Sequence, residues 1–238
     1  GGVQSMKTKI IVLQSSEISV TMGAKCIARA KEFGIELEIF DAIHGADAPE
    51  IIKELGLRQY KAKMKGGRLG VLGCFLSHYF LWKECIATQE PFMIFEHDAY
   101  MLRPLPKKVL KLFPDILKLD YLNPYDKTYN KEIEEQKDNQ QRVWSLHDRE
   151  EHGKHIHSHG LYSIGGYGYI IKPHAAQHIL DQINIYGFLP ADQQIYTSKH
   201  VDVHHIAPSV VRIHPEYQDD QSMKTLSLTR NLEANSNR

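Results

Sequence analysis

The sequence predicts an α/β fold built on a parallel sheet. The chain opens with a strand, a helix and a second strand in immediate succession, an order typical of parallel sheets. The apolar run FMIFE at residues 92–96 has the length and composition of a strand buried on both faces. Hydrophobic residues make up 42% and charged residues 24% of the 238 residues, as in an ordinary globular chain.

The individual elements follow from local patterns. Strands are expected where β-branched and apolar residues run together, at 9–14, 35–43, 92–96, 119–123, 167–171, 201–206 and 210–213. Helices are expected where apolar residues recur with a helical period, at 18–33, 49–57, 70–88, 107–113 and 173–183. Gly34 ends the first helix, and Pro173 begins the last one at the position that proline favours.

Residues 6–222 are expected to form a single domain. Residues 1–5 precede a methionine and look like a cloning remnant, and the polar residues 223–238 are expected to form a loose tail. Residues 125–159 are dense in charged and amide side chains around Trp144 and are expected to form a mobile insertion. Four histidines near its end, at 152, 155, 157 and 159, could bind zinc, although an exposed polar loop is the expectation.

Composition excludes several classes of protein. Lys+Arg and Asp+Glu both number 29, so a uniformly basic nucleic-acid coat and an acidic tail are excluded. There is neither a membrane-length apolar run nor a signal peptide, so a cytoplasmic protein without stable membrane insertion is expected. The three cysteines, Cys26, Cys74 and Cys85, are an odd number without metal-type spacing and are expected to be buried, reduced thiols.

The strongest chemical feature is FMIFEHD, a buried strand that ends in Glu96, His97 and Asp98. Ligands of open α/β sheets bind beyond the carboxyl ends of the strands, where charged groups are costly unless they are paired or bind a metal. A divalent cation that bridges a diphosphate would meet this need, with Asp98 as its ligand. His97 is either a second ligand or points away. The plainer alternative for Asp98 is a helix cap or a surface turn.

Three other features suggest a site. Asp192 follows Pro190 where a loop enters a helix, and it can serve as a general base or simply cap the helix. Ser77 and His78, inside the long helix, can reach a ligand or only form local hydrogen bonds. The stretch RQYKAKMKGGR is either a solvated loop or a site for an anion. Its basic residues are Arg58, Lys61, Lys63, Lys65 and Arg68.

These motifs, in this order, resemble glycosyltransferase family 25, which includes lipooligosaccharide sugar transferases and collagen galactosyltransferases. The resemblance spans about residues 9–222. It rests on Gly70-x-x-Gly73-Cys74-x-x-Ser77-His78-x-x-x-Trp82, Glu96-x-Asp98-Ala99, Gly166-x-Gly168-Tyr169-x-Ile171 and Pro190-x-Asp192.

The resemblance implies a GT-A-like fold, a mostly parallel twisted sheet with helices on both faces. It implies that a sugar is transferred, with inversion, to a hydroxyl of the acceptor. The donor would be a UDP-linked nucleotide sugar, and Asp192 would be the base. A late histidine, here His214, would complete the metal shell. The family has Glu-Asp-Asp where this chain has Glu96-His97-Asp98, and an imidazole shifts the preference toward Mn²⁺ over Mg²⁺. The candidates for contact with the donor are Gln14, Ser15, Asp41, Ser77, His78 and Glu96.

Three functions remain open from the sequence. The first is sugar transfer to a hydroxymethylated base of duplex DNA, held by the basic stretch in the host cytoplasm if the chain is viral. The second is transfer to a cell-surface saccharide such as lipooligosaccharide. The third is an inactive module that binds a sugar nucleotide, because His97 replaces an acid. No protein partner is implied.

Overall fold

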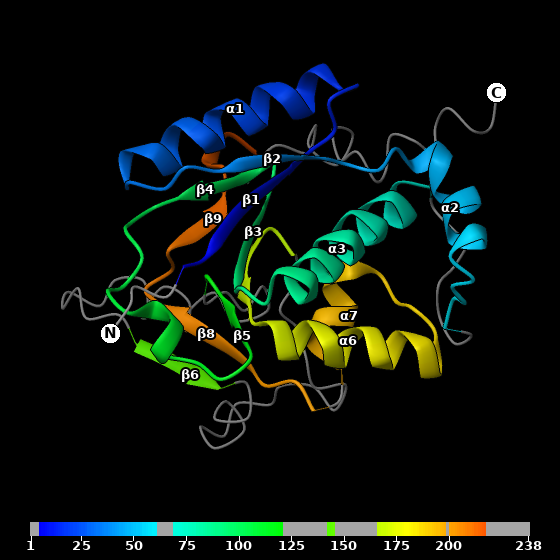
Figure 1. The fold of residues 1–238 in the computed structure, drawn as a ribbon. Coiled ribbons are helices and arrows are strands. Elements are labelled where there is room, and N and C mark those ends of the chain that lie inside the picture. Colours follow the sequence, from blue (N-terminus) through cyan, green and yellow to red (C-terminus); the bar gives the residue numbers. More distant parts are fainter. Residues whose placement is uncertain (1–4, 61–68, 121–141, 146–165, 199, 218–238) are drawn as a thin grey trace.

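The computed structural model describes residues 5–60, 69–120, 142–145, 166–198 and 200–217 (Figure 1). The helices are α1 (Glu17–Glu32), α2 (Ala48–Glu54), α3 (Leu69–Thr88), α6 (Pro173–Tyr186) and α7 (Ala191–Thr197), with short 3-10 turns at Gly45–Asp47, Val109–Lys111 and Pro215–Tyr217. The strands are β1 (Lys7–Val12), β2 (Glu38–Asp41), β3 (Phe92–Glu96), β4 (Ala99–Met101), β5 (Ile116–Lys118), β6 (Arg142–Ser145), β7 (Gly168–Ile171), β8 (Val203–Ala207) and β9 (Val211–Ile213).

A central sheet organises these elements. Within the described ranges it has seven strands in the order β2-β1-β3-β7-β5-β8-β6, and β4 pairs with β9 in a separate two-stranded sheet. Strands β2, β1 and β3 are parallel to one another, and β7 is antiparallel to both of its neighbours, β3 and β5. Strand β8 is parallel to β5, and β6 is antiparallel to β8. Five strands therefore run in one direction, and β6 and β7 run against them.

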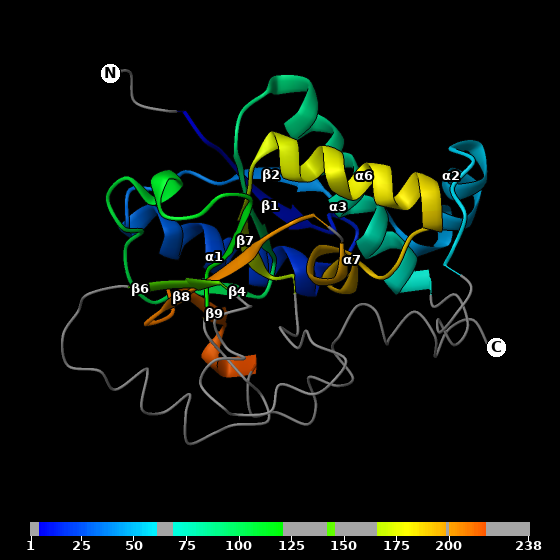
Figure 2. The same cartoon turned by 90° about the horizontal axis from the view of Figure 1, so that it is seen from below.

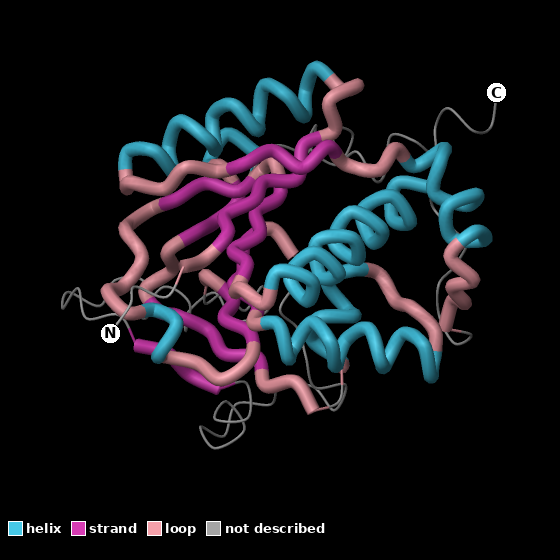
Figure 3. Tube along the Cα trace, in the orientation of Figure 1, coloured by secondary structure: helices cyan, strands magenta, loops and turns pink. Residues whose placement is uncertain are grey.

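Helices cover both faces of the sheet, as the view from below (Figure 2) and the tube in the orientation of Figure 1 (Figure 3) show. Successive residues of a strand point to opposite faces, so Ile10 and Val12 pack with Cys26 and Ala30 of α1, whereas Ile11 packs with α3. The layer of α3, α6 and α7 buries the larger side chains, among them Phe75, Trp82 and Tyr169. The predicted fold class, α/β with a mostly parallel sheet and helices on both faces, is confirmed.

Local chemistry explains how α1 and α3 are placed. The Ser16 hydroxyl accepts the Ser19 amide at 3.3 Å and caps the start of α1. Gly34, with φ 75°, turns the chain after the same helix in a left-handed conformation that glycine adopts without strain. In α3, a Cβ on Gly73 would lie 2.6 Å from the backbone oxygen of Ile43, so only glycine lets the helix approach the segment after β2 so closely.

Several expectations for the chain after β3 need correction. The strand expected at 119–123 is wrong: β5 lies before it, at Ile116–Lys118, because this apolar run is the part that pairs with β7 and β8. The helix expected at 107–113 is only the 3-10 turn Val109–Lys111. Strands β4 and β6 were not predicted, and β6 lies inside the predicted insertion at 125–159.

Some expectations fall on residues outside the described ranges. These are the tail at 223–238, the four histidines at 152–159 and the basic residues Lys61, Lys63, Lys65 and Arg68. Within the described part of the chain, no helix has both the length and the apolar character needed to cross a bilayer.

Candidate active site

Strands β1, β2 and β3 end together at one edge of the sheet. Their register sets Val12 opposite Asp41 on one side of β1 and Ile11 opposite Glu96 on the other. Just beyond these ends, the backbone amide of Gln14 donates to the Asp41 carboxylate at 3.3 Å. Two of the predicted nucleotide-side residues, Gln14 and Asp41, are therefore neighbours at the edge where β3 delivers its acids. Ser15 follows them in the exposed turn before α1.

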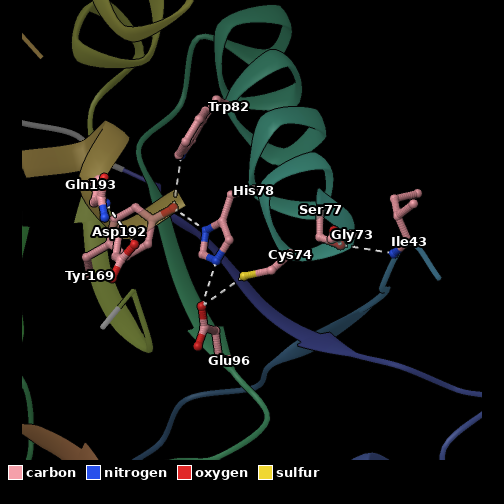
Figure 4. A network of polar contacts seen from close by, with 10 residues as sticks. All are labelled: Ile43, Gly73, Cys74, Ser77, His78, Trp82, Glu96, Tyr169, Asp192 and Gln193. Carbon is pink, nitrogen blue, oxygen red and sulfur yellow. Dashed lines mark hydrogen bonds and ion pairs between the residues drawn. The ribbon is translucent and has the colours of Figure 1, made fainter. Parts of the chain in front are cut away.

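Glu96 is held by two side chains of α3 (Figure 4). Its Oε1 atom lies 2.9 Å from His78 Nε2 and accepts the Cys74 thiol at 3.7 Å. His78 is fully buried, whereas the Glu96 side chain is 25% exposed and so reaches the surface of the sheet edge. Burial alone would raise the pKa of Glu96, but the hydrogen bond from His78 brings that pKa below its usual value.

Asp98, two residues further along, lacks such a partner. Its Oδ1 atom is sealed from solvent and meets no hydrogen-bond donor from the residues that the structure describes. Burial, and after it the negative charge of Glu96, raises the pKa of Asp98 to about 6. A buried carboxylate oxygen without a donor is costly unless a cation approaches it.

A third acid, on α7, also acts on this region. The pKa of the Cys74 thiol is raised well above its usual value by burial and then by the charges of Glu96, Asp192 and Asp98. The charge of Glu96 also helps to raise the pKa of Asp98, and a divalent cation would offset the repulsion between these two carboxylates. Oxygen ligands such as Asp98 Oδ1 suit a hard ion, so the residues present fit the predicted cation.

Asp192 is the second residue of α7 and not its cap. Pro190 occupies the capping position and makes no side-chain hydrogen bond to the helix. The half-buried Asp192 carboxylate accepts the backbone amide of Gln193, in the first turn of α7, at 2.8 Å. Asp192 is therefore not the N-cap residue, although it satisfies an amide of the first turn, and the role of general base stays a prediction.

The two histidines predicted as further metal ligands are engaged with protein groups. His97 Nδ1 lies 3.0 Å from the Ser19 hydroxyl of α1, which leaves only Nε2 as a candidate ligand atom. The His214 backbone amide donates to the Asp98 carbonyl at 2.8 Å, so β9 brings this residue beside the site. His214 Nδ1 accepts the Glu216 amide at 3.2 Å, and burial lowers the pKa of its ring. Both metal roles stay predictions.

Ser77 and Arg58 take part in local contacts. The Ser77 hydroxyl donates to the Gly73 carbonyl at 2.8 Å and accepts the Ile43 amide at 2.9 Å, and the residue is fully buried. Arg58 is exposed, and its guanidinium donates to the Ile185 carbonyl at 3.2 Å. These contacts are structural, and neither the donor role of Ser77 nor the anion role of Arg58 is tested by them.

The cysteines fall into two groups. Cys26 and Cys85 are buried, unpaired thiols, as expected, and burial raises the pKa of each to about 12. Cys74 is also unpaired but belongs to the site. Its sulfur, His78 and Glu96 offer three ligand atoms within 4.8 Å of one another, a donor set that a softer metal such as zinc can use.

Three residues of this network were not assigned a role from the sequence. The Tyr169 hydroxyl lies 2.7 Å from His78 Nδ1, and the Trp82 indole donates to that hydroxyl at 2.9 Å. A Cβ on Gly166 would lie 3.4 Å from Glu96 Oε1, so the backbone there closes over the carboxylate. The sequence did contain a pattern that could have linked Trp82 to the site. Cys74, His78 and Trp82 recur every four residues and therefore share one face of α3.

A second buried charge pair lies further along the same sheet. Lys118 Nζ and Asp120 Oδ1 are 3.1 Å apart, and both side chains are almost completely buried at the end of β5. The Lys118 ammonium also lies over the rings of Tyr167 and Tyr196, at 5.6 Å and 5.5 Å. Tyr196 is one turn beyond Asp192 on α7, so this pair supports the helix that carries the predicted base.

Comparison with known proteins gives a consistent picture. The family model described as "Glycosyltransferase family 25 (LPS biosynthesis protein)" matches residues 10–195. A glycosyltransferase 25 family member of Aedes aegypti is 24% identical over 174 residues, 69% of this chain and 26% of the relative. Human procollagen galactosyltransferase 2 is 26% identical over 163 residues, 66% of this chain and 23% of the relative. The probable inactive glycosyltransferase 25 family member 3 of rat is 32% identical over 101 residues, 40% of this chain and 18% of the relative.

The chain spans about a quarter or less of the length of these curated relatives. Among solved structures, the apo form of mouse xyloside xylosyltransferase 1 covers 81% of this chain, and 81% of that structure is covered in turn. The sequence identity is 9% and the TM-score is 0.35, which is too low to carry an argument.

Proposed function

The chain belongs to glycosyltransferase family 25, and from that premise we propose that it transfers a sugar from a nucleotide-sugar donor to a hydroxyl acceptor. The observation that supports this most directly is the pair of acids at the carboxyl end of β3, where Glu96 ends the strand and the buried Asp98 Oδ1 meets no donor from the described residues. Nucleotide ligands of α/β sheets bind at this edge. The finer proposal is that the donor is UDP-linked and that the sugar is transferred with inversion in a single displacement.

The donor side of the site is formed by the ends of β1, β2 and β3. The Gln14–Asp41 contact lies where the base and ribose of a nucleotide would approach. Asp98 would hold the divalent cation, for which Mn²⁺ is preferred over Mg²⁺, and the bound ion would neutralise charge on the departing diphosphate. Glu96 supplies a second carboxylate beside it, and His214 approaches through its backbone.

Asp192 provides the base for the acceptor. As the acceptor oxygen forms its bond to the anomeric carbon, the bond from that carbon to the diphosphate oxygen breaks. The hydroxyl proton of the acceptor passes to the Asp192 carboxylate. The position of Asp192 in the first turn of α7, half-buried and with its charge acting on Cys74, favours this role over that of an exposed surface acid.

Of the two predicted acceptors, a cell-surface saccharide is the better supported. The matching family model is described as an LPS biosynthesis protein, and one relative is a procollagen galactosyltransferase. The modified DNA base rests only on the basic stretch, most of which lies outside the described residues. We therefore place the saccharide first and keep duplex DNA as the second acceptor to test. Galactose is the first sugar to test, because it is named in that relative.

The inactive alternative has its own support. One relative is named as probably inactive, and here His97 stands between the two acids. An inactive module would bind a UDP-sugar without releasing UDP, whereas an enzyme would release it. The presence of Glu96 and Asp98 at the end of β3, with Asp98 Oδ1 lacking a donor among the described residues, favours the enzyme.

The test compares Asp192→Asn with the wild type in a UDP-release assay with Mn²⁺, a panel of UDP-sugars, and saccharide or hydroxymethylated duplex DNA as acceptor. Loss of a general base is expected to lower kcat by about 10²–10⁴-fold while the donor still binds. Asp181→Asn, on the exposed face of α6, is the matched control. Full turnover by Asp192→Asn would remove the residue from the mechanism, and no turnover of any donor by the wild type would support the inactive module.

A further inference from the structure

Four side chains form one line of hydrogen bonds that ends at the site. The line runs from Trp82 Nε1 to the Tyr169 hydroxyl (2.9 Å), to His78 Nδ1 (2.7 Å), and from His78 Nε2 to Glu96 Oε1 (2.9 Å) (Figure 4). Trp82, Tyr169 and His78 are all fully buried. Each group in the line must therefore find its partner within the line or leave a costly unsatisfied atom.

The donor at one end fixes the direction of the whole line. An indole N–H can only donate, so the Tyr169 oxygen accepts from Trp82. The single Tyr169 hydroxyl proton is then left for His78, whose Nδ1 must accept it and therefore carries no proton. The one proton of the neutral imidazole sits on Nε2, where it is donated to Glu96.

A reversed tautomer would leave an unsatisfied group. With a proton on Nδ1, both Trp82 and His78 would donate to the Tyr169 oxygen, and the tyrosine proton would have no acceptor along the line. Because an unsatisfied buried donor is costly, the reversed tautomer is expected to be less populated than the other by more than tenfold. The rings also restrict rotation, since His78 stacks on Tyr169 with centroids 5.7 Å apart and lies 6.0 Å from the Trp82 ring.

This direction decides against the softer metal at the Cys74–His78–Glu96 cluster. A ring nitrogen that carries a proton has no lone pair for a metal, and His78 Nε2 is that nitrogen. Binding there would move the proton to Nδ1 and break the line behind it. The cluster is therefore organised to hold Glu96.

The hydrogen-bonded line and its neighbours enclose the Oε1 atom of Glu96 but not its Oε2 atom. Oε1 receives both the imidazole and the Cys74 thiol, and the backbone at Gly166 closes over it. Figure 4 shows the second carboxylate oxygen pointing away from His78. The Glu96 side chain is 25% exposed, and the residue ends β3 opposite Ile11 of β1.

We propose that Trp82, Tyr169 and His78 are positioning residues that turn Glu96 Oε1 into the protein and present Oε2 to a hydroxyl of the nucleotide sugar. The inference rests on the proposed function of this site. A carboxylate oxygen accepts hydrogen bonds, and the hydroxyls of a ribose or a hexose are the groups of a nucleotide sugar that donate them. The three residues act through Glu96 and do not touch the donor themselves.

The test separates positioning from simple packing. Tyr169→Phe removes one oxygen and leaves the ring, and is expected to raise the KM for the UDP-sugar about tenfold with little change in kcat. Tyr79→Phe removes a hydroxyl from the residue next to His78 on α3, outside the line, and is expected to leave both constants unchanged. A Tyr169→Phe variant whose KM equals that of the control would overturn the proposal.

Replacement of His78 gives an independent readout. His78→Gln keeps an N–H donor at a similar reach and is expected to hold the donor KM near that of the wild type. His78→Leu keeps bulk without a donor and is expected to raise the KM at least as much as Tyr169→Phe. If the glutamine variant were as impaired as the leucine variant while both are folded, hydrogen bonding to Glu96 would not be the function of His78.

The tautomer can be read without turnover. Nitrogen NMR of the 15N-histidine-labelled wild type, with His78→Gln to assign His78 among 14 histidines, should show its Nδ1 unprotonated and its Nε2 protonated. A proton on Nδ1 would refute the direction of the line, even if Tyr169→Phe failed to fold. A wild type that turns over no donor would instead refute the proposed function while this signature remained intact.

Discussion

Helix α3 carries two buried polar stripes that differ in what they hold. Gly73 and Ser77 face the segment after β2, where the Ser77 hydroxyl joins the Gly73 carbonyl and the Ile43 amide at 2.8 Å and 2.9 Å. His78, only one residue further along, faces β3 and lies 2.9 Å from the carboxylate of Glu96. The first stripe stabilises a stretch of backbone, and the second orients a charged group at the candidate site.

The difference shows that the partner, and not the residue type, decides the role of a buried polar side chain. Adjacent residues of an α-helix point about 100° apart, so Ser77 and His78 reach different neighbours although they follow each other in the sequence. Changes to the first stripe should therefore lower stability and leave turnover per folded molecule intact. Changes to the acids of the candidate site, Glu96 and Asp98, should instead lower turnover.

The largest expected effect is that of Asp98→Asn on turnover. Removing the charge that would hold the cation should lower kcat by about 10²–10³-fold, the usual loss when electrostatic stabilisation of a transition state is removed. The increase in Tm that Mn²⁺ gives in the presence of a UDP-sugar should disappear as well. Asp181→Asn is again the surface control, and a variant that retains Mn²⁺-dependent donor binding would show that Asp98 is not the ligand.

The same variant should stabilise the metal-free protein, in a pH-dependent way. The pKa of Asp98 is raised from 3.8 to about 6, so the folded state holds this proton more tightly than the unfolded state does. Its contribution to stability therefore falls as the pH rises from about 4 to 6 and stays unfavourable above that, by on the order of 3 kcal/mol. In urea, the free energy of unfolding of Asp98→Asn should exceed that of the wild type at pH 7 and equal it at pH 4. An equal difference at both pH values would contradict the raised pKa.

A smaller effect, on stability alone, is expected for Gly73→Ala in the first stripe. The new Cβ would lie 2.6 Å from the Ile43 carbonyl, a backbone atom that cannot move aside as a flexible side chain could. Overpacking of this kind costs about 1–3 kcal/mol, which outweighs the gain in helix propensity. Urea unfolding should detect the loss, while kcat corrected for the folded fraction should not change. A variant with normal stability and reduced kcat would reverse the assignment of the two stripes.

The sequence predicted the first half of the sheet more accurately than the second. Strands β1, β2 and β3 are joined by local crossovers and run parallel, so the strand-helix-strand order was sufficient to predict that they form a parallel sheet. Strand β6 is only four residues long, lies in a charged stretch and pairs with β8, whose residues follow it by about sixty positions. No local pattern contains that pairing, because a strand this short depends on its partner for stability.

The same limit applies to the candidate site. Glu96 and Asp98 were predicted because acids that follow a buried strand stand out in the sequence. The hydroxyl of Tyr169 was not, because its meeting with His78 depends on β7 lying antiparallel beside β3, with Ile94 opposite Tyr169. That register joins segments about 75 residues apart and has no signature in either of them.

The smallest expected effect is that of Ser77→Ala, which tests the first stripe without any added volume. The alanine leaves the Ile43 amide without its acceptor in a half-buried place, and this should cost about 1 kcal/mol of unfolding free energy. Helix propensity offsets part of the loss, since alanine is favoured over serine inside a helix. The donor KM and kcat should equal those of the wild type, because neither partner of Ser77 is a group of the site. If Ser77→Ala raised the donor KM as much as Tyr169→Phe does, then Ser77 would act on the donor as well, and the two stripes of α3 would form a single site.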